Sequence, residues 1–184
     1  MNIKNVKELC ISLFAELRAA VAFRAIPASV EGPFILRGFK WRDFSSVRRI
    51  YRELNPEGRL SWLRLVIGLL SYRKLLLVIE NAHREIVGIE LFYFNARDVS
   101  EATVHEGFIG VSEACRGLGL ATKMRIAAKG HFKRNGLAGI STRIAQDNPA
   151  SLLSALKSGF EIVETHASNN VENHYMVCSL GDNK

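Results

Sequence analysis

The segment from Val111 to Thr122, which reads VSEACRGLGLAT, has the composition of a ligand-binding turn. Its glycines allow the backbone to approach a ligand closely. A helix that begins there leaves its first N–H groups without internal partners, and the helix dipole adds partial positive charge. Together with the charge of Arg116, these groups predict a site for an anion such as a phosphate.

Two common phosphate motifs do not describe this segment. No Gly-Lys-Ser/Thr follows the glycines as in a P-loop, and the third glycine of the dinucleotide motif G-x-G-x-x-G is absent. Lys123, Arg125 and Lys129 lie further along the predicted helix and add charge that a polyphosphate would attract. Taken alone, the segment also fits a tight turn whose glycines serve packing only.

The elements that must position this segment follow from apolar spacing and from turn residues. Helical spacing predicts helices over residues 4–24, 43–54, 60–70, 116–134 and 149–157. Strands are predicted over residues 34–39, 75–80, 86–94, 103–111, 137–144, 160–164 and 175–180. The fold class is therefore α/β, with a mixed, mostly antiparallel central sheet of six to seven strands, helices on both faces and an extra amino-terminal helix.

Composition limits the classes of function. The chain has 184 residues, enough for one domain with a sizeable core, and its net charge of +7 favours anionic partners. The most apolar stretch, residues 60–79, contains three basic residues and does not read as a membrane span. The three cysteines have neither metal-site nor disulfide spacing, and the amino terminus lacks a signal-peptide pattern. We expect a cytoplasmic protein without a bound metal.

Two elements of the chain resemble the GNAT family of N-acetyltransferases. The run from Arg116 to Ala121 is similar to the family motif R/Q-x-x-G-x-G/A. The run from Asn148 to Phe160 resembles the later helix of the family, which reads Asn, then Ala, then Leu-Tyr, then Lys, then Gly-Phe. One helix and one strand separate the two elements, as they do in the family. The order of elements agrees with that of the family over about residues 33–180. This agreement argues against a chance match of the two motifs.

The resemblance implies a GNAT-like domain over residues 33–184 that uses acetyl-CoA. Residues 1–32 form a helical extension outside it, packed on the domain or on a partner. Backbone amides of the loop would bind the pyrophosphate, and the strand before it would bind the pantetheine arm and polarise the thioester carbonyl. The cofactor-binding residues implied in this way are Ile109, Val111, Arg116, Gly117, Leu118, Gly119, Leu120, Ala121, Thr122, Asn148 and Ser151.

The family's direct attack of an amine on the thioester needs a group that accepts a proton. His105 is the leading candidate, because neutral imidazole suits this task and some family members, such as the serotonin N-acetyltransferases, place a histidine at a matching position. Strand alternation predicts that His105 shares a face with Ile109 and Val111. A histidine at the solvent end of a strand is the alternative interpretation.

Two carboxylates are further candidates for the base. Glu106 is predicted to point to the face opposite His105, so that only one of the two faces the cleft, and Glu90 lies on the preceding strand. A chain of water molecules would make a single essential base unnecessary. The tyrosine that often serves as general acid in the later helix aligns with Ala155, so that acid is missing, and Tyr175 is the candidate replacement.

We therefore expect an N-acyltransferase that moves an acetyl group from acetyl-CoA to a primary amine of a small molecule, such as an amino sugar or an amino-acid-like metabolite. The alternative is a non-catalytic coenzyme-A-binding or regulatory module with the same fold. Small residues near Gly107 and Gly110 leave room for an acyl group larger than acetyl. No nucleic-acid partner is expected, because no recognition motif is present. The apolar face of the amino-terminal helix would allow a homodimer.

Overall fold

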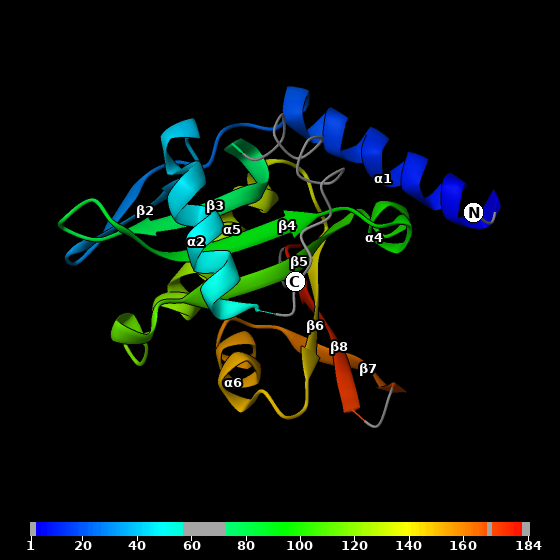
Figure 1. The fold of residues 1–184 in the computed structure, drawn as a ribbon. Coiled ribbons are helices and arrows are strands. Elements are labelled where there is room, and N and C mark those ends of the chain that lie inside the picture. Colours follow the sequence, from blue (N-terminus) through cyan, green and yellow to red (C-terminus); the bar gives the residue numbers. More distant parts are fainter. Residues whose placement is uncertain (1–2, 57–72, 169–170, 182–184) are drawn as a thin grey trace.

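The computed structural model describes residues 3–56, 73–168 and 171–181 (Figure 1). The helix predicted over residues 60–70 lies outside these ranges. Among the described residues, no helix is long and apolar enough to span a membrane.

One mixed sheet organises the molecule, as the sequence predicts. Its order is β1-β2-β3-β4-β5-β6-β8-β7, and every neighbouring pair is antiparallel except β5 and β6. The strands are β1 (Ser29–Glu31), β2 (Phe34–Gly38), β3 (Leu76–Glu80), β4 (Ile86–Tyr93), β5 (Thr103–Val111), β6 (Gly139–Ala145), β7 (Glu161–Ser168) and β8 (Val171–Ser179).

The eighth strand, β1, is the difference from the predicted six to seven strands. It lies in the segment that the prolines and Gly32 mark as a break. Gly32, with φ of +63°, makes a tight turn that lets Ser29–Glu31 pair with Phe34–Leu36. The sheet therefore begins inside the segment that was predicted to be a separate helical extension.

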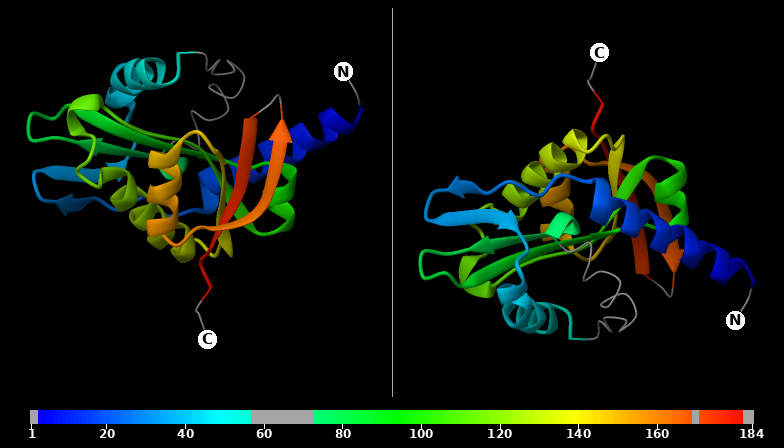
Figure 2. Two further views of the ribbon diagram at one scale, coloured as in Figure 1. Left: turned by 90° about the horizontal axis from the view of Figure 1, so that it is seen from below. Right: turned by 90° about the horizontal axis from the view of Figure 1, so that it is seen from above.

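Helices cover both faces of the sheet, with α2 (Phe44–Leu54) on one face and α5 (Leu120–Arg134) and α6 (Pro149–Lys157) on the other (Figures 1 and 2). The larger apolar core joins α5 to the sheet through Met124 and Phe132, and a smaller core lies under α2 around Ile50. Helix α1 (Ile3–Ala22) contacts the short helix α4 (Ala96–Ser100) where β4 ends and β5 begins. Short 3-10 turns span Trp41–Asp43 and Glu113–Cys115.

Strand β5 has an irregularity at Gly107 that shapes the centre of the sheet. Phe108 pairs with Leu91 and Glu106 with Phe92, so Gly107 is an extra residue in a β-bulge. A side chain at Gly107 would collide with the Tyr93 ring, which explains the glycine. Pairing of β5 with β6 ends at Glu106 and Thr142, so the second half of β5 leaves its parallel neighbour.

Some boundaries differ from the predicted ones. Helix α5 begins at Leu120 rather than at residue 116, because the 3-10 turn and the glycine loop occupy the preceding residues. Strands β7 and β8 extend further toward their shared hairpin than the predicted strands. The space beside Gly107 is filled by the Tyr93 ring. The space beside Gly110 is filled by Leu54 and Phe108. These two glycines therefore do not leave room for a larger acyl group.

Candidate functional site

The loop before α5 has the backbone that the anion-site prediction requires. Gly117 and Gly119 have φ of +78° and +72°, a conformation that side chains disfavour. Gly119 is the N-cap of α5, no side chain caps the first-turn N–H groups, and the space beside both glycines is open. Buried Leu120 anchors the start of the helix in the core. The loop therefore presents N–H donors at the positive end of a fifteen-residue helix.

The positive charges along α5 are arranged differently from the prediction. Lys123 forms an ion pair with Glu31 of β1 at 3.2 Å, and Lys129 donates to the Ser158 carbonyl at 2.8 Å. Arg125 is 1% exposed and points into the core, so it does not contribute to a surface that attracts phosphate. Arg116, exposed in the loop, is the cation placed for that task.

The bulge at Gly107 overturns the predicted face of His105. Glu106 pairs with Phe92, and Phe92, Ile109 and Val111 all pack in the core under α5. His105 pairs with Tyr93 on the opposite face, the α2 side. Glu106 rather than His105 therefore shares a face with Ile109 and Val111, because the extra residue shifts the strand alternation by one. The two side chains do point to opposite faces, as predicted, but both are buried.

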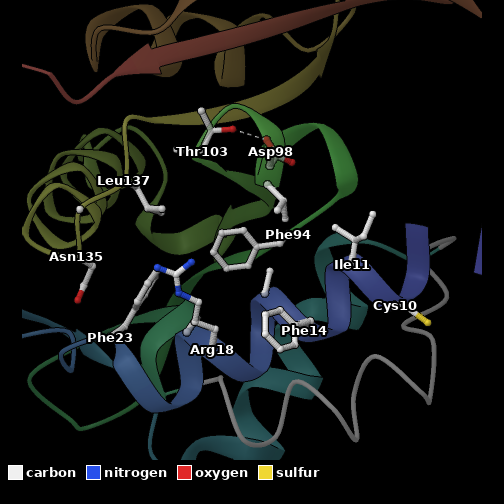
Figure 3. A pocket seen from close by; sticks show the side chains of 15 residues that line it. Cys10, Ile11, Phe14, Arg18, Phe23, Phe94, Asp98, Thr103, Asn135 and Leu137 are labelled. Atoms are coloured by element: carbon white, nitrogen blue, oxygen red, sulfur yellow. Dashed lines mark hydrogen bonds between the residues drawn. The ribbon is translucent and has the colours of Figure 1, made fainter. Parts of the chain in front are cut away.

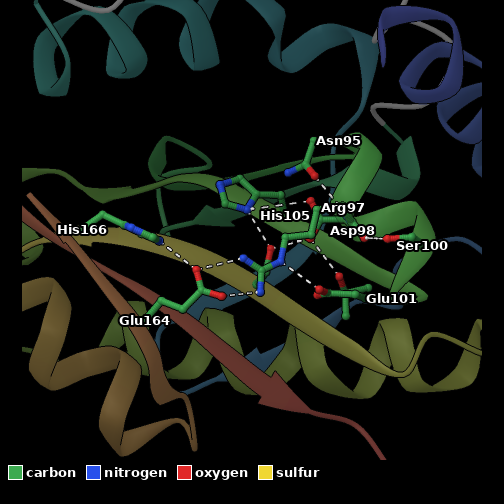
Figure 4. Close-up of polar contacts among 10 residues, drawn as sticks. Asn95, Arg97, Asp98, Ser100, Glu101, His105, Glu164 and His166 are labelled. Carbon is green, nitrogen blue, oxygen red and sulfur yellow. Dashed lines mark hydrogen bonds and ion pairs between the residues drawn. The ribbon is translucent and has the colours of Figure 1, made fainter. Parts of the chain in front are cut away.

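The His105 cluster joins β5, β6 and α4 through short hydrogen bonds (Figure 4). We use this name for His105, Ser141, Asp98, Thr103 and Tyr175. His105 Nδ1 lies 2.7 Å from Ser141 Oγ, and Ser141 Oγ donates to Asp98 Oδ1 at 2.6 Å. Thr103 Oγ1 donates to the same oxygen at 2.8 Å, while Asp98 Oδ2 lies 4.0 Å from His105 Nδ1.

These contacts determine the tautomer of His105. The hydroxyl hydrogen of Ser141 is used on Asp98, so Ser141 Oγ can only accept from the imidazole. Nδ1 therefore carries the hydrogen, and Nε2 is the basic nitrogen of the neutral ring. Asp98 is 0% exposed and its Oδ2 has no hydrogen-bond partner within the described ranges. A carboxylate oxygen 4.0 Å from Nδ1 is close enough to stabilise an imidazolium that forms when Nε2 accepts a proton.

Tyr175 completes this cluster on β8, opposite Arg143 of β6. Burial raises the pKa of its phenol, and Ser141 and Asp98 lie close enough to act on that pKa. The phenol oxygen has no hydrogen-bond partner in the described part of the chain. A neutral phenol can donate a proton, which is the role expected for Tyr175 from the sequence.

A second group, the Glu106 cluster, lies on the α5 face and contains Glu106, Arg125, Glu90, Thr142 and Ser151. Arg125 Nε and Nη2 donate to the two Glu106 oxygens at 2.9 and 2.6 Å, and Thr142 Oγ1 donates to Oε1 at 3.3 Å. Both partners of this ion pair are buried. Because Arg125 binds both of its oxygens, Glu106 is poorly placed to accept a proton from a substrate, and it holds α5 against β5.

Glu90 lies beside this pair without a hydrogen bond of its own among the described residues. Burial raises the pKa of Glu90 well above its usual value, and the Glu106 carboxylate raises it further. Both effects favour the neutral carboxyl group over the carboxylate, which makes Glu90 less suited to act as the base.

Helix α6 begins next to this cluster. Asn148 Oδ1 caps the helix by accepting from Ser151 N at 3.1 Å, and Arg125 donates to the Ser151 carbonyl at 3.1 Å. Thr122 Oγ1 and Ser154 Oγ lie 3.2 Å apart and link α5 to α6. Three predicted cofactor residues thus have structural contacts at the junction of the two helices. Position 155, where the family often has a tyrosine, is a buried alanine and offers no hydroxyl.

Charged residues surround the His105 cluster (Figure 4). Arg97 of α4 bonds Glu164 of β7 through both oxygens, at 3.1 and 2.9 Å, and lies 4.1 Å from the Tyr175 ring centre. Hydrogen bonds from Arg97 and His166 lower the pKa of Glu164 to about 2. This network joins the ends of α4 and β7 over Tyr175. No group of three or more His, Cys, Asp or Glu residues that could hold a metal occurs in the residues described.

The structure therefore places His105 and Tyr175 on either side of Ser141 and puts Glu106 in a different cluster. Sequence reasoning missed Asp98 and Ser141, which lie seven residues before His105 and 36 residues after it. No spacing rule joins them, because Asp98 comes from a five-residue helix and Ser141 from a parallel strand.

Comparisons with known proteins agree with this fold. The model of the acetyltransferase (GNAT) family matches residues 41–160, more than half of the chain. The chain therefore belongs to the GNAT family of acetyltransferases, and it is an N-acetyltransferase that uses acetyl-CoA. No curated protein matches the sequence significantly.

Solved structures share the fold at low identity. Ribosomal-protein-S5-alanine acetyltransferase from Vibrio fischeri has a TM-score of 0.70 at 15% identity over 86% of this chain and 99% of that one. A putative acetyltransferase from Salmonella typhimurium with its cofactor acetyl-CoA has a TM-score of 0.66 at 18% identity, over 82% and 96%. A chimera of spermidine N-acetyltransferase from Vibrio cholerae and hSSAT has a TM-score of 0.64 at 16% identity, over 81% and 96%.

The residues present fit acetyl-CoA. A side chain at Gly117 or Gly119 would enter the open space in front of the α5 N-terminus, where a pyrophosphate would bind. Beyond Glu106, the edge of β5 that faces β6 is no longer paired with that strand. This edge can pair with an extended group such as a pantetheine arm.

Proposed function

We propose that this protein acetylates a primary amine of a small molecule, such as an amino sugar or an amino-acid-like metabolite, and that His105 is the general base. The observation that carries the proposal is the chain from His105 Nδ1 through Ser141 to Asp98, close to the point where β5 and β6 stop pairing. Related folds act on proteins as well as on polyamines, so the small size of the acceptor is part of the proposal.

Each residue has a defined task in this scheme. Acetyl-CoA supplies the activated acetyl group when it is bound. The loop from Arg116 to Thr122 holds its pyrophosphate, and the backbone at Ile109 and Val111 holds its arm. Asn148 and Ser151 at the start of α6 contact the end of that arm. His105 takes a proton from the amine through Nε2, and Asp98 stabilises the resulting imidazolium through Ser141 and its own charge.

Tyr175 is the proposed source of the proton for the departing sulfur. Its phenol is neutral at physiological pH because burial raises its pKa, and its hydrogen has no acceptor within the described residues. Glu106 is assigned to positioning instead, because Arg125 and Thr142 use both of its oxygens. We also propose a cytoplasmic location, which the three free cysteines support.

The test is a screen of acceptors with acetyl-CoA, read as free thiol and checked by the mass of the product. The panel contains amino sugars, amino acids, polyamines and short peptides with free amino termini. We expect at least one small amine to raise thiol release well above the rate without acceptor. Activity on peptides alone would refute the proposed acceptor class. Binding of acetyl-CoA without transfer to any amine would instead favour the non-catalytic module.

A further inference from the structure

A cavity lies between α1 and the α4 end of the sheet, where Asp98 and Thr103 of the His105 cluster form part of its wall (Figure 3). Its volume is about 560 Å³, within the range of roughly 300–1,000 Å³ typical of small-molecule sites. One wall is α1 from Cys10 onward together with Phe23, which follows this helix, and the opposite wall is α4 together with the turn between α5 and β6. At 1.5 Å per residue, the α1 wall is about 20 Å long, which suits an elongated ligand.

The walls of this cavity are mainly apolar. Phe14 of α1 points toward it, as do Phe23, Phe94 and Leu137 from the segments that follow α1, β4 and α5 (Figure 3). Phe14 is 73% exposed, an unusual state for a phenylalanine, and none of the described elements covers it. An apolar chain bound there would remove this surface from water.

The polar groups of the cavity are mostly engaged elsewhere. Asp98 is fully buried and accepts from Thr103 and Ser141, so its charge is not presented to the cavity. Asn135 accepts from the Arg24 backbone and donates to the His131 carbonyl.

Arg18 is the exception. Its guanidinium extends from α1 into the cavity toward Leu137 and Phe94 (Figure 3), and it makes no ion pair with any residue that the structure describes. An exposed arginine beside an apolar wall offers a planar donor pair that matches a carboxylate.

We propose that this cavity binds a fatty carboxylate, with its aliphatic chain on Phe14 and Phe94 and its carboxylate on Arg18. The site is distinct from the acetyl-CoA channel. The cavity meets β5 at Thr103, whereas the acetyl-CoA arm is proposed to bind at Ile109 and Val111 of the same strand. These residues lie six to eight positions further along β5, which corresponds to about 20–27 Å. Arg18 disfavours an amine here, so the cavity is not an extension of the acceptor site.

Titration calorimetry with monomeric decanoate, well below its micelle concentration, tests the proposal on the full chain. Decyltrimethylammonium, which has the same chain and the opposite charge, is the ligand control. Arg18→Gln removes the anchoring charge, and Arg24→Gln is the matched control, because Arg24 is an exposed arginine that does not line the cavity. Ala15→Trp fills the cavity from α1, and its melting temperature shows whether the fold is kept.

We expect one saturable site for decanoate. Arg18→Gln should weaken decanoate about tenfold, the loss expected for one charge-assisted hydrogen bond, while Arg24→Gln leaves the affinity unchanged. Decyltrimethylammonium should bind at least tenfold more weakly than decanoate, and folded Ala15→Trp should not bind decanoate. Equal affinities for the two ligands, or equal effects of the two arginine variants, would overturn the assignment. Absence of saturation at millimolar decanoate would also overturn the fatty-carboxylate assignment. If the protein were then found to be a dimer that Ala15→Trp disrupts, the cavity would be occupied by a second copy of the chain.

Discussion

Replacement of Asp98 by asparagine isolates the proposed role of the His105 cluster. The substitution keeps the size of the side chain and one oxygen that accepts from Ser141 and Thr103. It removes the negative charge and places an amide donor where Oδ2 lies, 4.0 Å from the His105 Nδ1 donor. The variant therefore retains the fold of the cluster while it loses the stabilisation of a protonated imidazole.

The size of the effect follows from that distance. Two unit charges 4.0 Å apart at an effective dielectric constant of about 20 interact by about 4 kcal/mol. Each 1.36 kcal/mol of barrier changes the rate tenfold, so the full interaction corresponds to about 10³-fold. Because part of the charge is already shared with the Ser141 and Thr103 hydroxyls, we expect kcat to fall by about 10²–10³-fold.

The assay is steady-state thiol release by Asp98→Asn across pH, with the amount of folded protein checked by melting temperature. The acid limb of the pH profile should move to lower pH, because His105 loses its proton more readily without the carboxylate. Glu101→Gln is the control, since it removes an exposed acid at the end of the same helix without touching the cluster, and it should change kcat less than twofold. An Asp98→Asn protein with the kcat and pH profile of the wild type would refute the role of Asp98.

Three further predictions concern stability and cofactor binding. Arg125→Met leaves the Glu106 carboxylate buried and unpaired, so urea titration should show a free energy of unfolding lower by about 3–5 kcal/mol; a loss below about 1 kcal/mol would contradict the buried pair. Burial lowers the pKa of His131 to about 4, whereas the usual pKa of a histidine, which we take for the unfolded chain, is about 6.5. The contribution of His131 to the free energy of unfolding is therefore complete above pH 6.5 and falls by about 3 kcal/mol as the pH drops to 4. His131→Gln should remove that part of the acid sensitivity in urea titrations at pH 7 and pH 4, and an unchanged sensitivity would disprove its origin. Gly119→Trp should abolish the rise in melting temperature that acetyl-CoA causes in the wild type, whereas an undiminished rise would exclude the loop from the cofactor site.

The sequence predicts the elements whose ends carry local signals. Helix α6 has its predicted bounds because Asn148 caps it, proline occupies its first turn and Gly159 follows its last residues with φ of +86°. Gly136, with φ of +77°, similarly marks the stop just after α5. The cofactor loop is recognisable for the same reason, since its glycines and the helix that follows are contiguous in sequence.

The arrangement of catalytic side chains depends on tertiary contacts that local patterns do not contain. The face of His105 was predicted wrongly because the bulge at Gly107 results from packing of the Tyr93 ring on a neighbouring strand. Asp98 and Ser141 meet His105 only through the fold, from a short helix and a parallel strand. Arg125 looks like a surface cation in sequence, and only its contact with Glu106 explains its burial.

The decisive experiment for His105 is the pH dependence of kcat/KM for the wild type and for His105→Ala, measured with the best acceptor from the screen. For the wild type, we expect kcat/KM to fall toward low pH as His105 becomes protonated. His105→Ala should lower kcat/KM by at least 10²-fold and lose that limb, while acetyl-CoA still raises its melting temperature. A His105→Ala protein that keeps the wild-type kcat/KM across the whole pH range would show that another group accepts the proton.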